Sequence, residues 1–541
     1  MSTRLVSLDF SRELARLTQG FTGREWLVDK LARIIAGQPE QIILLTGEPG
    51  IGKSSLAARL LTVRQDVAAR HFCVARRIDT ITPGTVIRSL ATQLSAALPA
   101  FNIALLESIK PWQVELNVHI QIKNPAPGTT TTGVLIQNIS ATNPDEELEL
   151  LLRAPLATMK ASARNVVIVI DALDEALSYR GTPNLVELLA KLGGLPSWLT
   201  LFCTSRRSDA VLGHLQPLQP FVLDAGSPEN LADVRAYVEK RVSDPSIIAR
   251  LQQSGIDTET LIEGVTQRAA GNFLYAVIVL DDMATGRLRL EKFEELPQGL
   301  DAVYAGFLRR FSDEDWQSMF QPILGKLAVA QEPLTEDQLA AFTGMTPSKV
   351  RNALGILDQY LIFSEIGGAA VSFELFHESL REFLRAPNRA GRYWCNPAEE
   401  HGAIADYYLT ELKAKGVSSD PYLIRHLPLH LAQAGRSEAL IGQLSDYTWL
   451  KNKLENMTVY ELLADFRLAP PQTPITEIES ILRLSTFALE RDAGQFWNQF
   501  HSRSLSAPQP LLQKYPKRPE IPWLRLRRPS LRQFGDPLKW V

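Results

Sequence analysis

The segment GEPGIGKS, residues 47–54, constrains the fold of this 541-residue chain more than any other feature. It fits the pattern G-x-x-x-x-G-K-[S/T], follows the apolar run QIILLT at 41–46, and opens the helical pattern GKSSLAARLL. In such a strand–loop–helix setting, glycines let successive backbone N–H groups face one anion, and the helix start adds its positive dipole end. The alternative is a glycine-rich turn that fits by chance, but the context favours a phosphate-binding loop.

The residue types in this loop predict distinct roles toward a bound nucleotide. Lys53 can reach the β- and γ-phosphates, Ser54 can ligate Mg²⁺, and Ser55 can donate to the α-phosphate. We therefore expect ATP or ADP and Mg²⁺ as ligands. The residues expected to line the nucleotide are Gly47, Glu48, Pro49, Gly50, Ile51, Gly52, Lys53, Ser54 and Ser55.

The stretch VVIVIDALDEA, residues 166–176, runs from a buried apolar strand directly into three carboxylates. A Mg²⁺ ion on a nucleotide needs an acidic ligand from a neighbouring strand, and Asp171 ends this one. Burying an unpaired carboxylate is costly, and a metal ion reverses that penalty. Asp171 is thus the predicted second metal ligand beside Ser54. The alternative is that Asp171 only caps the following helix.

Three further residues are candidates for hydrolysis, together with Lys53. Asp174 and Glu175 lie about one helical turn past Asp171, where a carboxylate can orient or deprotonate the attacking water, and we favour Glu175. The alternative is that both are acids of a first helical turn, where the positive end of the helix dipole stabilises negative charge. Arg206 ends the strand run LTLFCTSR, where it can contact the γ-phosphate or remain a solvated surface charge.

Strands alternate with helices through the first part of the chain, which predicts an α/β P-loop NTPase domain with helices on both faces of a parallel sheet. Between two of these strands, the runs at 114–124 and 129–139 alternate around a Pro-Gly turn and predict an inserted β-hairpin at 114–139. The expected strands are 41–46, 71–77, 166–171, 199–205 and 221–225.

After about residue 227 the pattern becomes mostly helical. Two helices, a third amphipathic helix and a hairpin within 333–376 are the layout of a winged-helix domain, and amphipathic helices from 396 to 505 predict an α-helical superstructure. The predicted divisions are a lead at 1–19, the nucleotide-binding domain at 20–226, a helical domain at 227–300, a winged-helix domain at 301–390, a helical repeat-like domain at 391–507 and a Pro/Arg-rich linker at 508–541.

Composition excludes several classes of function. The net charge of -3 and the pI near 6.3 give no general attraction to nucleic acid or anionic membrane. No uncharged apolar stretch approaches the about 18 residues of a membrane helix, and the start has no secretory h-region, so we expect a soluble cytoplasmic protein. Cys73, Cys203 and Cys395 are far apart, which predicts buried thiols rather than a disulfide framework.

Taken together, these motifs resemble the NACHT branch of the STAND family, the signal-transduction ATPases with numerous domains. DALDE at 171–175 is similar to that branch's acidic motif. FTGRE at 21–25 resembles its entry motif, which implies that Arg24 lies near the adenine. GNFL at 271–274 falls where the family has its glycine-proline motif, with Phe273 in place of the proline.

The resemblance extends toward the C-terminus. FELFHESLREFL at 373–384 is similar to the family's winged-helix histidine motif, which implies that His377 touches the β-phosphate of ADP at rest. The alternative is an ordinary histidine at a helix start. The segment 522–541 resembles the stretch that precedes a C-terminal WD-repeat propeller in bacterial relatives, and we expect no propeller within residues 1–541.

The resemblance implies a molecular switch that is ADP-bound and autoinhibited at rest. ATP exchange would drive homo-oligomerisation, and slow hydrolysis would reset the switch. A protein or ligand trigger would be sensed by the C-terminal region, and the resemblance implies a role in bacterial antiviral defence. One alternative is a DNA-associated ATPase similar to replication initiators. The expected recognition helix offers it Lys349 and Arg351, which is little positive charge for binding in a DNA groove. The other is a nucleotide-bound scaffold that does not hydrolyse. Nucleic acid and membrane are not expected partners.

Overall fold

A computed structural model describes most of the chain, which forms two compact units. The N-terminal unit comprises 2–179 and 183–310, and the C-terminal unit comprises 180–182 and 311–541. The predicted hairpin at 114–139 lies outside the described residues, as does the predicted linker at 508–541 apart from Leu531. The described residues are 7–37, 42–108, 143–159, 165–193, 195–216, 218–288, 296–366, 370–416, 418–472, 474–504 and 531.

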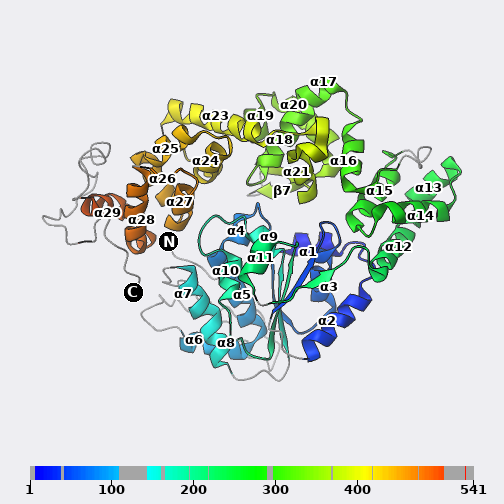
Figure 1. Cartoon of the computed structure of the whole chain (residues 1–541), viewed down its shortest axis with the longest axis horizontal. Coiled ribbons are helices and arrows are strands. Elements are labelled where there is room, and N and C mark those ends of the chain that lie inside the picture. Colours follow the sequence, from blue (N-terminus) through cyan, green and yellow to red (C-terminus); the bar gives the residue numbers. More distant parts are fainter. Residues whose placement is uncertain are drawn as a thin grey trace, which may run out of the picture. The chain divides into compact units, whose positions relative to one another are not determined.

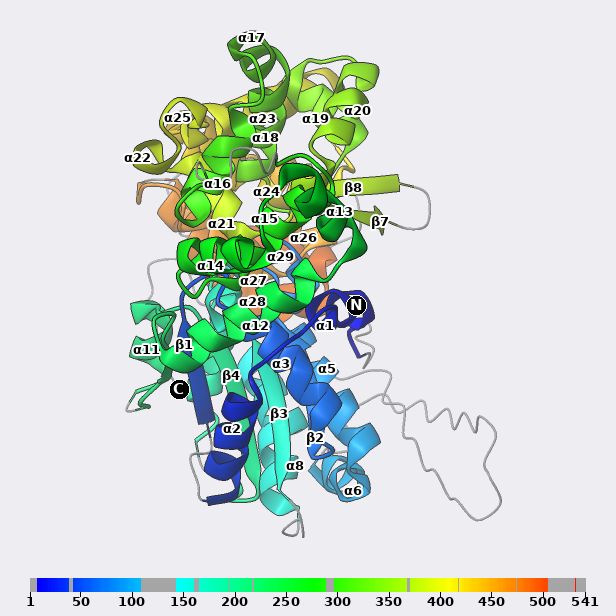
Figure 2. The same cartoon turned by 90° about the vertical axis from the view of Figure 1, so that its right-hand side faces the viewer.

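The N-terminal unit is built on a five-stranded parallel sheet in the order β2-β3-β4-β1-β5. Because all strands point the same way, the carboxyl ends of β1, β3 and β4 lie at one edge (Figure 2). The strands are β1 (Ile42–Gly47), β2 (Val67–Phe72), β3 (Val166–Asp171), β4 (Leu199–Ser205) and β5 (Phe221–Leu223).

Alternating side chains of each strand enter two separate hydrophobic cores, one on each face of the sheet. In β3, Val167 and Val169 pack with α2 (Glu25–Gly37) and α3 (Lys53–Val63). Ile168 and Ile170 pack on the opposite face with α5 (Pro83–Ala97) and α10 (Leu185–Ala190), as Figure 1 shows. Burial on both faces explains why the strands read as continuous apolar runs, and it confirms the predicted α/β class.

The second strand differs from its prediction at 71–77. The structure places β2 earlier, at Val67–Phe72, although β3 and β4 coincide with their predicted ranges. After Cys73, whose N–H donates to the Asp171 carbonyl, β3 has ended and offers no further partner. The backbone then turns, with the Val74 N–H donating to Thr80 Oγ1 at 2.9 Å.

The first described residues are part of the N-terminal unit. Phe10, 1% exposed, packs its ring against His71 and Phe72 of β2 and immediately precedes α1 (Ser11–Thr18). The other helices that accompany the sheet are α4 (Ile78–Ile81), α6 (Pro99–Ser108), α7 (Pro144–Leu148), α8 (Ala154–Thr158), α9 (Leu173–Ala176) and α11 (Asp209–His214).

Helices complete the N-terminal unit after β5. Polar residues cap several of them: Ser227 caps α12, Asp257 caps α14 and Asn272 caps α15, each by accepting a backbone N–H of the first turn. The N-terminal unit ends at Arg310, so the boundary between the units falls inside the predicted 301–390 domain. These helices are α12 (Pro228–Val242), α13 (Pro245–Ser254), α14 (Thr258–Ala269), α15 (Phe273–Ala284) and α16 (Gly299–Leu308).

The C-terminal unit begins with helices and a three-stranded antiparallel sheet in the order β6-β8-β7. The winged-helix assignment of this region remains a prediction. The elements are α17 (Asp313–Asp315), α18 (Gln321–Val329), β6 (Leu334–Thr335), α19 (Glu336–Thr343), α20 (Pro347–Ile356), β7 (Leu361–Ile366), β8 (Ala370–Leu375), α21 (Glu378–Arg385) and α22 (Pro387–Ala390).

The rest of the C-terminal unit is helical within the part that the structure describes. The helices are α23 (Pro397–Lys415), α24 (Pro421–Gln433), α25 (Ser437–Leu444), α26 (Tyr447–Asn456), α27 (Val459–Phe466), α28 (Ile475–Arg491) and α29 (Phe496–Arg503). None of the described helices is long and apolar enough to span a bilayer. All three cysteines are buried and free, as predicted.

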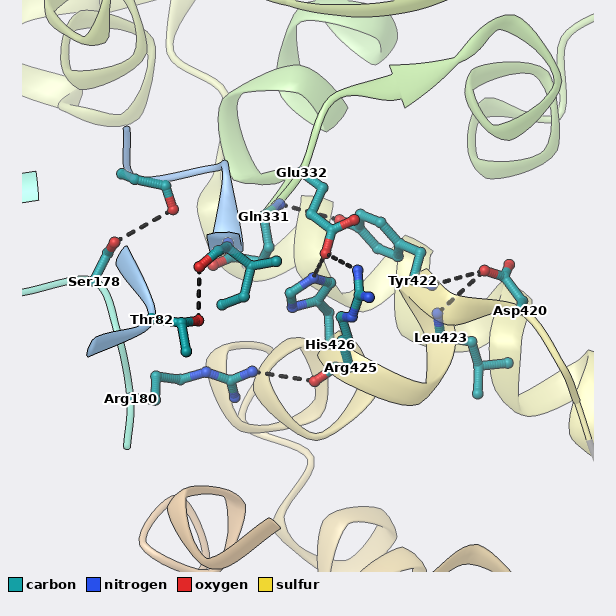
Figure 3. A network of polar contacts seen from close by, with 12 residues as sticks. Thr82, Ser178, Arg180, Gln331, Glu332, Asp420, Tyr422, Leu423, Arg425 and His426 are labelled. Atoms are coloured by element: carbon teal, nitrogen blue, oxygen red, sulfur yellow. Dashed lines mark hydrogen bonds and ion pairs between the residues drawn. The ribbon is translucent and has the colours of Figure 1, made fainter. Parts of the chain in front are cut away.

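Helix α24 carries a network of polar contacts inside the C-terminal unit (Figure 3). Glu332 accepts hydrogen bonds from Arg425 at 2.8 Å and pairs with His426 Nε2 at 2.9 Å. The Arg425 carbonyl accepts a hydrogen bond from Arg180 at 3.1 Å. Because Glu332 has two basic partners, its pKa is held below the usual value despite its burial.

A pair of buried histidines next to this network predicts acid sensitivity. His401 and His430 face each other with their Nδ1 atoms 2.7 Å apart, and Tyr422 Oη lies 3.1 Å from His430 Nε2. Burial, reinforced by Arg385 and Arg381, lowers the pKa of His401 to about 4. Burial also lowers the pKa of His430, with His401 and His426 adding to the effect.

We expect the free energy of unfolding to fall as the pH drops below about 6.5, the ordinary histidine pKa. Between that value and about 4, the unfolded chain binds the proton and the folded chain does not. His401 alone predicts a loss of about 2 kcal/mol at pH 5 relative to pH 7. Urea unfolding of the chain and of His401→Gln at both pH values measures the slope, and equal stability of the wild type at pH 5 and pH 7 would contradict it.

Candidate nucleotide site

The glycine-rich loop connects the end of β1 to the start of α3, as predicted. Gly50 and Gly52 have φ angles of +79° and +92°, a region that other residues enter only with strain. Gly52 is also the N-cap of α3 and has no side chain to satisfy the first N–H groups of the helix. The loop therefore presents backbone donors at a helix start, which is the arrangement that binds phosphate.

Lys53 lies folded over this loop. Its ammonium donates to the carbonyls of Gly47 at 2.7 Å and Glu48 at 2.9 Å. Burial lowers the pKa of Lys53 to about 8, while the negative charges of Asp174 and Asp171 oppose that shift. Among the carboxylates, Asp174 has the largest effect on this lysine.

Asp171 lies at the carboxyl end of β3 and is 3% exposed. Its carboxylate accepts hydrogen bonds from the hydroxyls of Thr204 and Ser54, which lower its pKa, but burial outweighs them and raises it. The sequence suggested that this strand neighbours β1. The structure instead inserts β4 between them, and Thr204 of β4 occupies the intervening position.

The residues at this position fit a Mg²⁺ ion. A buried carboxylate with a raised pKa gains from a divalent cation, and the adjacent Ser54 hydroxyl is a hard oxygen ligand. No group of three or more His, Cys, Asp or Glu side chains in the described residues could hold a metal ion. One carboxylate and one hydroxyl suit Mg²⁺, which takes one or two protein ligands and completes its shell with phosphate and water oxygens.

Asp174 and Arg206 form one polar pair at the ends of β3 and β4. Arg206 donates its backbone N–H to Asp174 at 2.9 Å, and its Nε lies 3.3 Å from the same carboxylate. Ala172 has a left-handed φ of +57° and donates its N–H to Thr204. This turn directs Asp174 toward β4, so the two predicted residues are brought together.

Glu175 points elsewhere. Its carboxylate accepts the backbone N–H of Ala75 at 2.9 Å, in the segment that follows β2. Asp174 thus lies with Arg206, and its negative charge acts on Lys53.

Arg24 contacts the loop backbone directly, and its expected place near the adenine stays a prediction. Its guanidinium, 2% exposed, donates to the Ile51 carbonyl and to Asn230 Oδ1, both at 2.6 Å, and lies over the Phe273 ring. Burial lowers the pKa of Arg24 to about 10, and Asp233 opposes the shift, so the side chain is charged at neutral pH.

His377 belongs to the C-terminal unit, where it caps α21. Its Nδ1 accepts the Ser379 N–H at 3.1 Å and lies 2.7 Å from the Ser379 hydroxyl. This local role agrees with the alternative that the sequence left open, and the predicted contact with ADP stays a prediction.

Sequence reasoning missed Thr204, Asn230 and Asp233. A weak sequence signal exists for Thr204, because it is a polar residue near the end of the apolar strand β4. Its hydroxyl contacts Asp171. Asn230 and Asp233 lie in the first turns of α12 and contact Arg24 across more than 200 residues of sequence, which no local pattern encodes.

The sheet order, the loop between β1 and α3, and Asp171 at the edge of β3 define the N-terminal unit as an α/β P-loop ATPase fold. The family model of the AAA ATPase domain matches residues 20–201.

The chain is also similar to vegetative incompatibility protein HET-E-1 of Podospora anserina, with 22% identity over 248 residues. The match covers 42% of this chain and 18% of that protein, so the chain spans less than a fifth of its relative's length.

Two solved structures show remote similarity. A STAND protein with a tetratricopeptide repeat sensor from Pyrococcus horikoshii has 14% identity and a TM-score of 0.35, covering 95% of this chain and 66% of that one. The Orc1 protein of Aeropyrum pernix, solved in complex with DNA, has 15% identity and a TM-score of 0.27, covering 72% of this chain and 94% of that one.

Proposed function

We propose that this protein is a signalling switch that binds ATP and ADP and hydrolyses ATP slowly. The observation that carries the proposal is the convergence of the phosphate loop, Lys53 and the buried Asp171–Ser54 pair at one edge of the sheet. A slow hydrolase that responds to its bound nucleotide fits the resemblance to STAND ATPases.

Each residue has a proposed task in hydrolysis. Lys53 binds the β- and γ-phosphates, and Asp171 and Ser54 would hold Mg²⁺, which supplies charge neutralisation when bound. Asp174 orients the attacking water, because it lies with Arg206 and close enough to influence Lys53. Arg206 contacts the γ-phosphate. Glu175 fixes the segment after β2 through the Ala75 N–H.

The roles of the two acids can be separated. We expect Asp174→Asn to lower the single-turnover rate of ATP hydrolysis by about 10²–10⁴-fold, the usual loss for a group that handles the water proton. We expect Glu175→Gln to keep most of the rate, since the glutamine side-chain oxygen can still accept the Ala75 N–H. The opposite order of the two rates would assign the water-orienting role to Glu175. Full activity in both variants would mean that neither acid orients the water.

The switch itself rests on the resemblance. We propose that ADP and His377 hold a resting state and that ATP exchange, driven by a trigger sensed by the C-terminal region, leads to homo-oligomers. A role in defence is proposed by analogy only, since the relative HET-E-1 is named for vegetative incompatibility.

His377→Asn tests the resting state. Asparagine is a good N-cap, so it can still accept the Ser379 N–H while removing the imidazole. We expect ADP to dissociate about tenfold faster from this variant, with an unchanged melting temperature without nucleotide. Stopped-flow release of a fluorescent ADP measures the rate, and a rate equal to that of the wild type would contradict the proposed contact.

The basic residues of α20 give little support to the DNA-associated alternative. Arg351 pairs with Glu336 at 2.6 Å, and Lys349 donates to the Ser318 carbonyl at 2.9 Å, so both basic side chains already have partners within the C-terminal unit. The third possibility, a scaffold that does not hydrolyse, predicts no single turnover in the wild type.

A further inference from the structure

Three successive carbonyl groups of the phosphate loop accept hydrogen bonds from its rear side. Asn272 Nδ2 donates to the Pro49 carbonyl at 2.9 Å, and the Leu274 N–H donates to the Gly50 carbonyl at 3.1 Å. Arg24 completes the series on Ile51 at 2.6 Å. All of these groups belong to the N-terminal unit.

These contacts bear directly on the shape of the loop. The N–H groups of a phosphate loop can converge on an anion only while the intervening carbonyls point away from it. A carbonyl that is fixed on the rear side therefore keeps its peptide plane in the binding orientation. Hydrogen bonds to the carbonyls of three consecutive loop residues hold the loop in that shape before phosphate arrives, which lowers the ordering cost of binding.

The donors are themselves held in place by α15. Asn272 caps this helix by accepting the Tyr275 N–H at 3.2 Å, and this bond orients its amide group toward Pro49. Leu274 is the second residue of α15, so its N–H has no partner inside the helix and is satisfied by the Gly50 carbonyl instead. The loop thus caps α15 while α15 fixes the loop.

Arg24 is equally constrained. It has a φ of +73°, a strained value for a residue with a side chain, and such a conformation persists only when its surroundings impose it. Asn230 Oδ1 binds the same guanidinium nitrogen that reaches Ile51, and Asp233 accepts the Arg24 backbone N–H at 3.2 Å. Both residues lie on α12.

The segment between these helices is tightly fitted as well. Asn230 Nδ2 donates to the carbonyls of Ala225 and Gly271, at 2.7 and 2.9 Å. Gly271 has a φ of +82°, and a Cβ atom there would lie 2.0 Å from the Ala225 carbonyl oxygen. The start of α15 therefore has little freedom to move without breaking its bonds to the loop.

We propose that Arg24, Asn272 and the Leu274 N–H form a rear clamp that presets the phosphate loop and couples nucleotide binding to helices α12 and α15. Their proposed role is to position the loop, and they act through its backbone carbonyls. By linkage, a nucleotide that favours the clamped loop stabilises the start of α15 by the same free energy. This inference rests on the proposed nucleotide-binding function.

Asn272→Ser tests the clamp. Serine keeps the N-cap of α15 without adding charge, but its side chain is too short to reach the Pro49 carbonyl. The matched control is Asn184→Ser, which changes the N-cap of α10 in the same unit. Calorimetric titration with ADP should give an affinity about tenfold weaker for Asn272→Ser and unchanged for Asn184→Ser, with similar melting temperatures for both without nucleotide.

Hydrogen exchange supplies a readout that a general loss of stability would not move. In the wild type, ADP should slow exchange of the Leu274 amide, and Asn272→Ser and Arg24→Met should weaken that protection while α10 is unaffected. Equal ADP affinity in Asn272→Ser and the wild type, or a Leu274 amide that ignores ADP in a wild type that binds it, overturns the clamp. A wild type that fails to bind ADP overturns the proposed function instead.

Discussion

Lys53→Ala is expected to weaken binding of both ADP and ATP by at least about 100-fold, the equivalent of about 3 kcal/mol. The ammonium lies over the loop on the carbonyls of Gly47 and Glu48, and its burial already lowers its pKa to about 8. Phosphate would add to the negative charge that Asp174 and Asp171 already place near this buried cation. Alanine removes the charge and leaves the glycine-rich backbone unchanged.

Calorimetric titration of the full chain measures this loss. Lys191→Ala is the matched control, because Lys191 pairs with Asp145 at an exposed position of the same unit. We expect its affinity to equal that of the wild type. If Lys53→Ala bound ADP as tightly as Lys191→Ala, the nucleotide could not lie in this loop.

The second large effect concerns the stability of the C-terminal unit. Asp465 and Lys453 form an ion pair in which both side chains are 1% exposed, and Arg180 also reaches Asp465 at 3.0 Å. Removing one partner leaves the other charge buried and uncompensated. We expect Asp465→Ala to lower the free energy of unfolding by about 3–5 kcal/mol.

The chain offers a matched comparison in Asp406→Ala. Asp406 pairs with Arg436 in the same unit, but the two side chains are 52% and 41% exposed, so water screens their interaction. We expect that variant to lose at most about 1 kcal/mol. Urea unfolding of both variants measures the difference, and equal losses would mean that burial does not decide the strength of these pairs.

The sequence predicts the nucleotide-binding fold well where the signal is local. The phosphate loop is a contiguous motif, and β3 and β4 are apolar runs because both faces of the sheet are buried. The position of Asp171 at the edge of the sheet follows from the end of such a run.

Relationships between distant segments could not be predicted in this way. The insertion of β4 between β1 and β3 depends on the topology of the whole sheet. The bounds of β2 differ from the predicted 71–77 because the pairing with β3 sets where β2 begins and ends. The contact of Asn272 with Pro49 joins residues 223 positions apart. The sequence can indicate that Asn272 caps α15, but not that its amide also donates to the Pro49 carbonyl.

The placement of the Asp174 and Glu175 side chains shows the same limit. Both acids stand one residue apart after Asp171, and the sequence favoured Glu175. The left-handed turn at Ala172 sends Asp174 toward Arg206 and leaves Glu175 on the Ala75 N–H. An alanine in that conformation has no signature that separates it from a helical alanine.

The most direct test of the account is to denature the purified full chain and identify the nucleotide that it releases, beside Lys53→Ala prepared in the same way. We expect close to one ADP per wild-type chain and none from Lys53→Ala. A wild-type chain that releases no nucleotide and binds neither added ADP nor added ATP would contradict it.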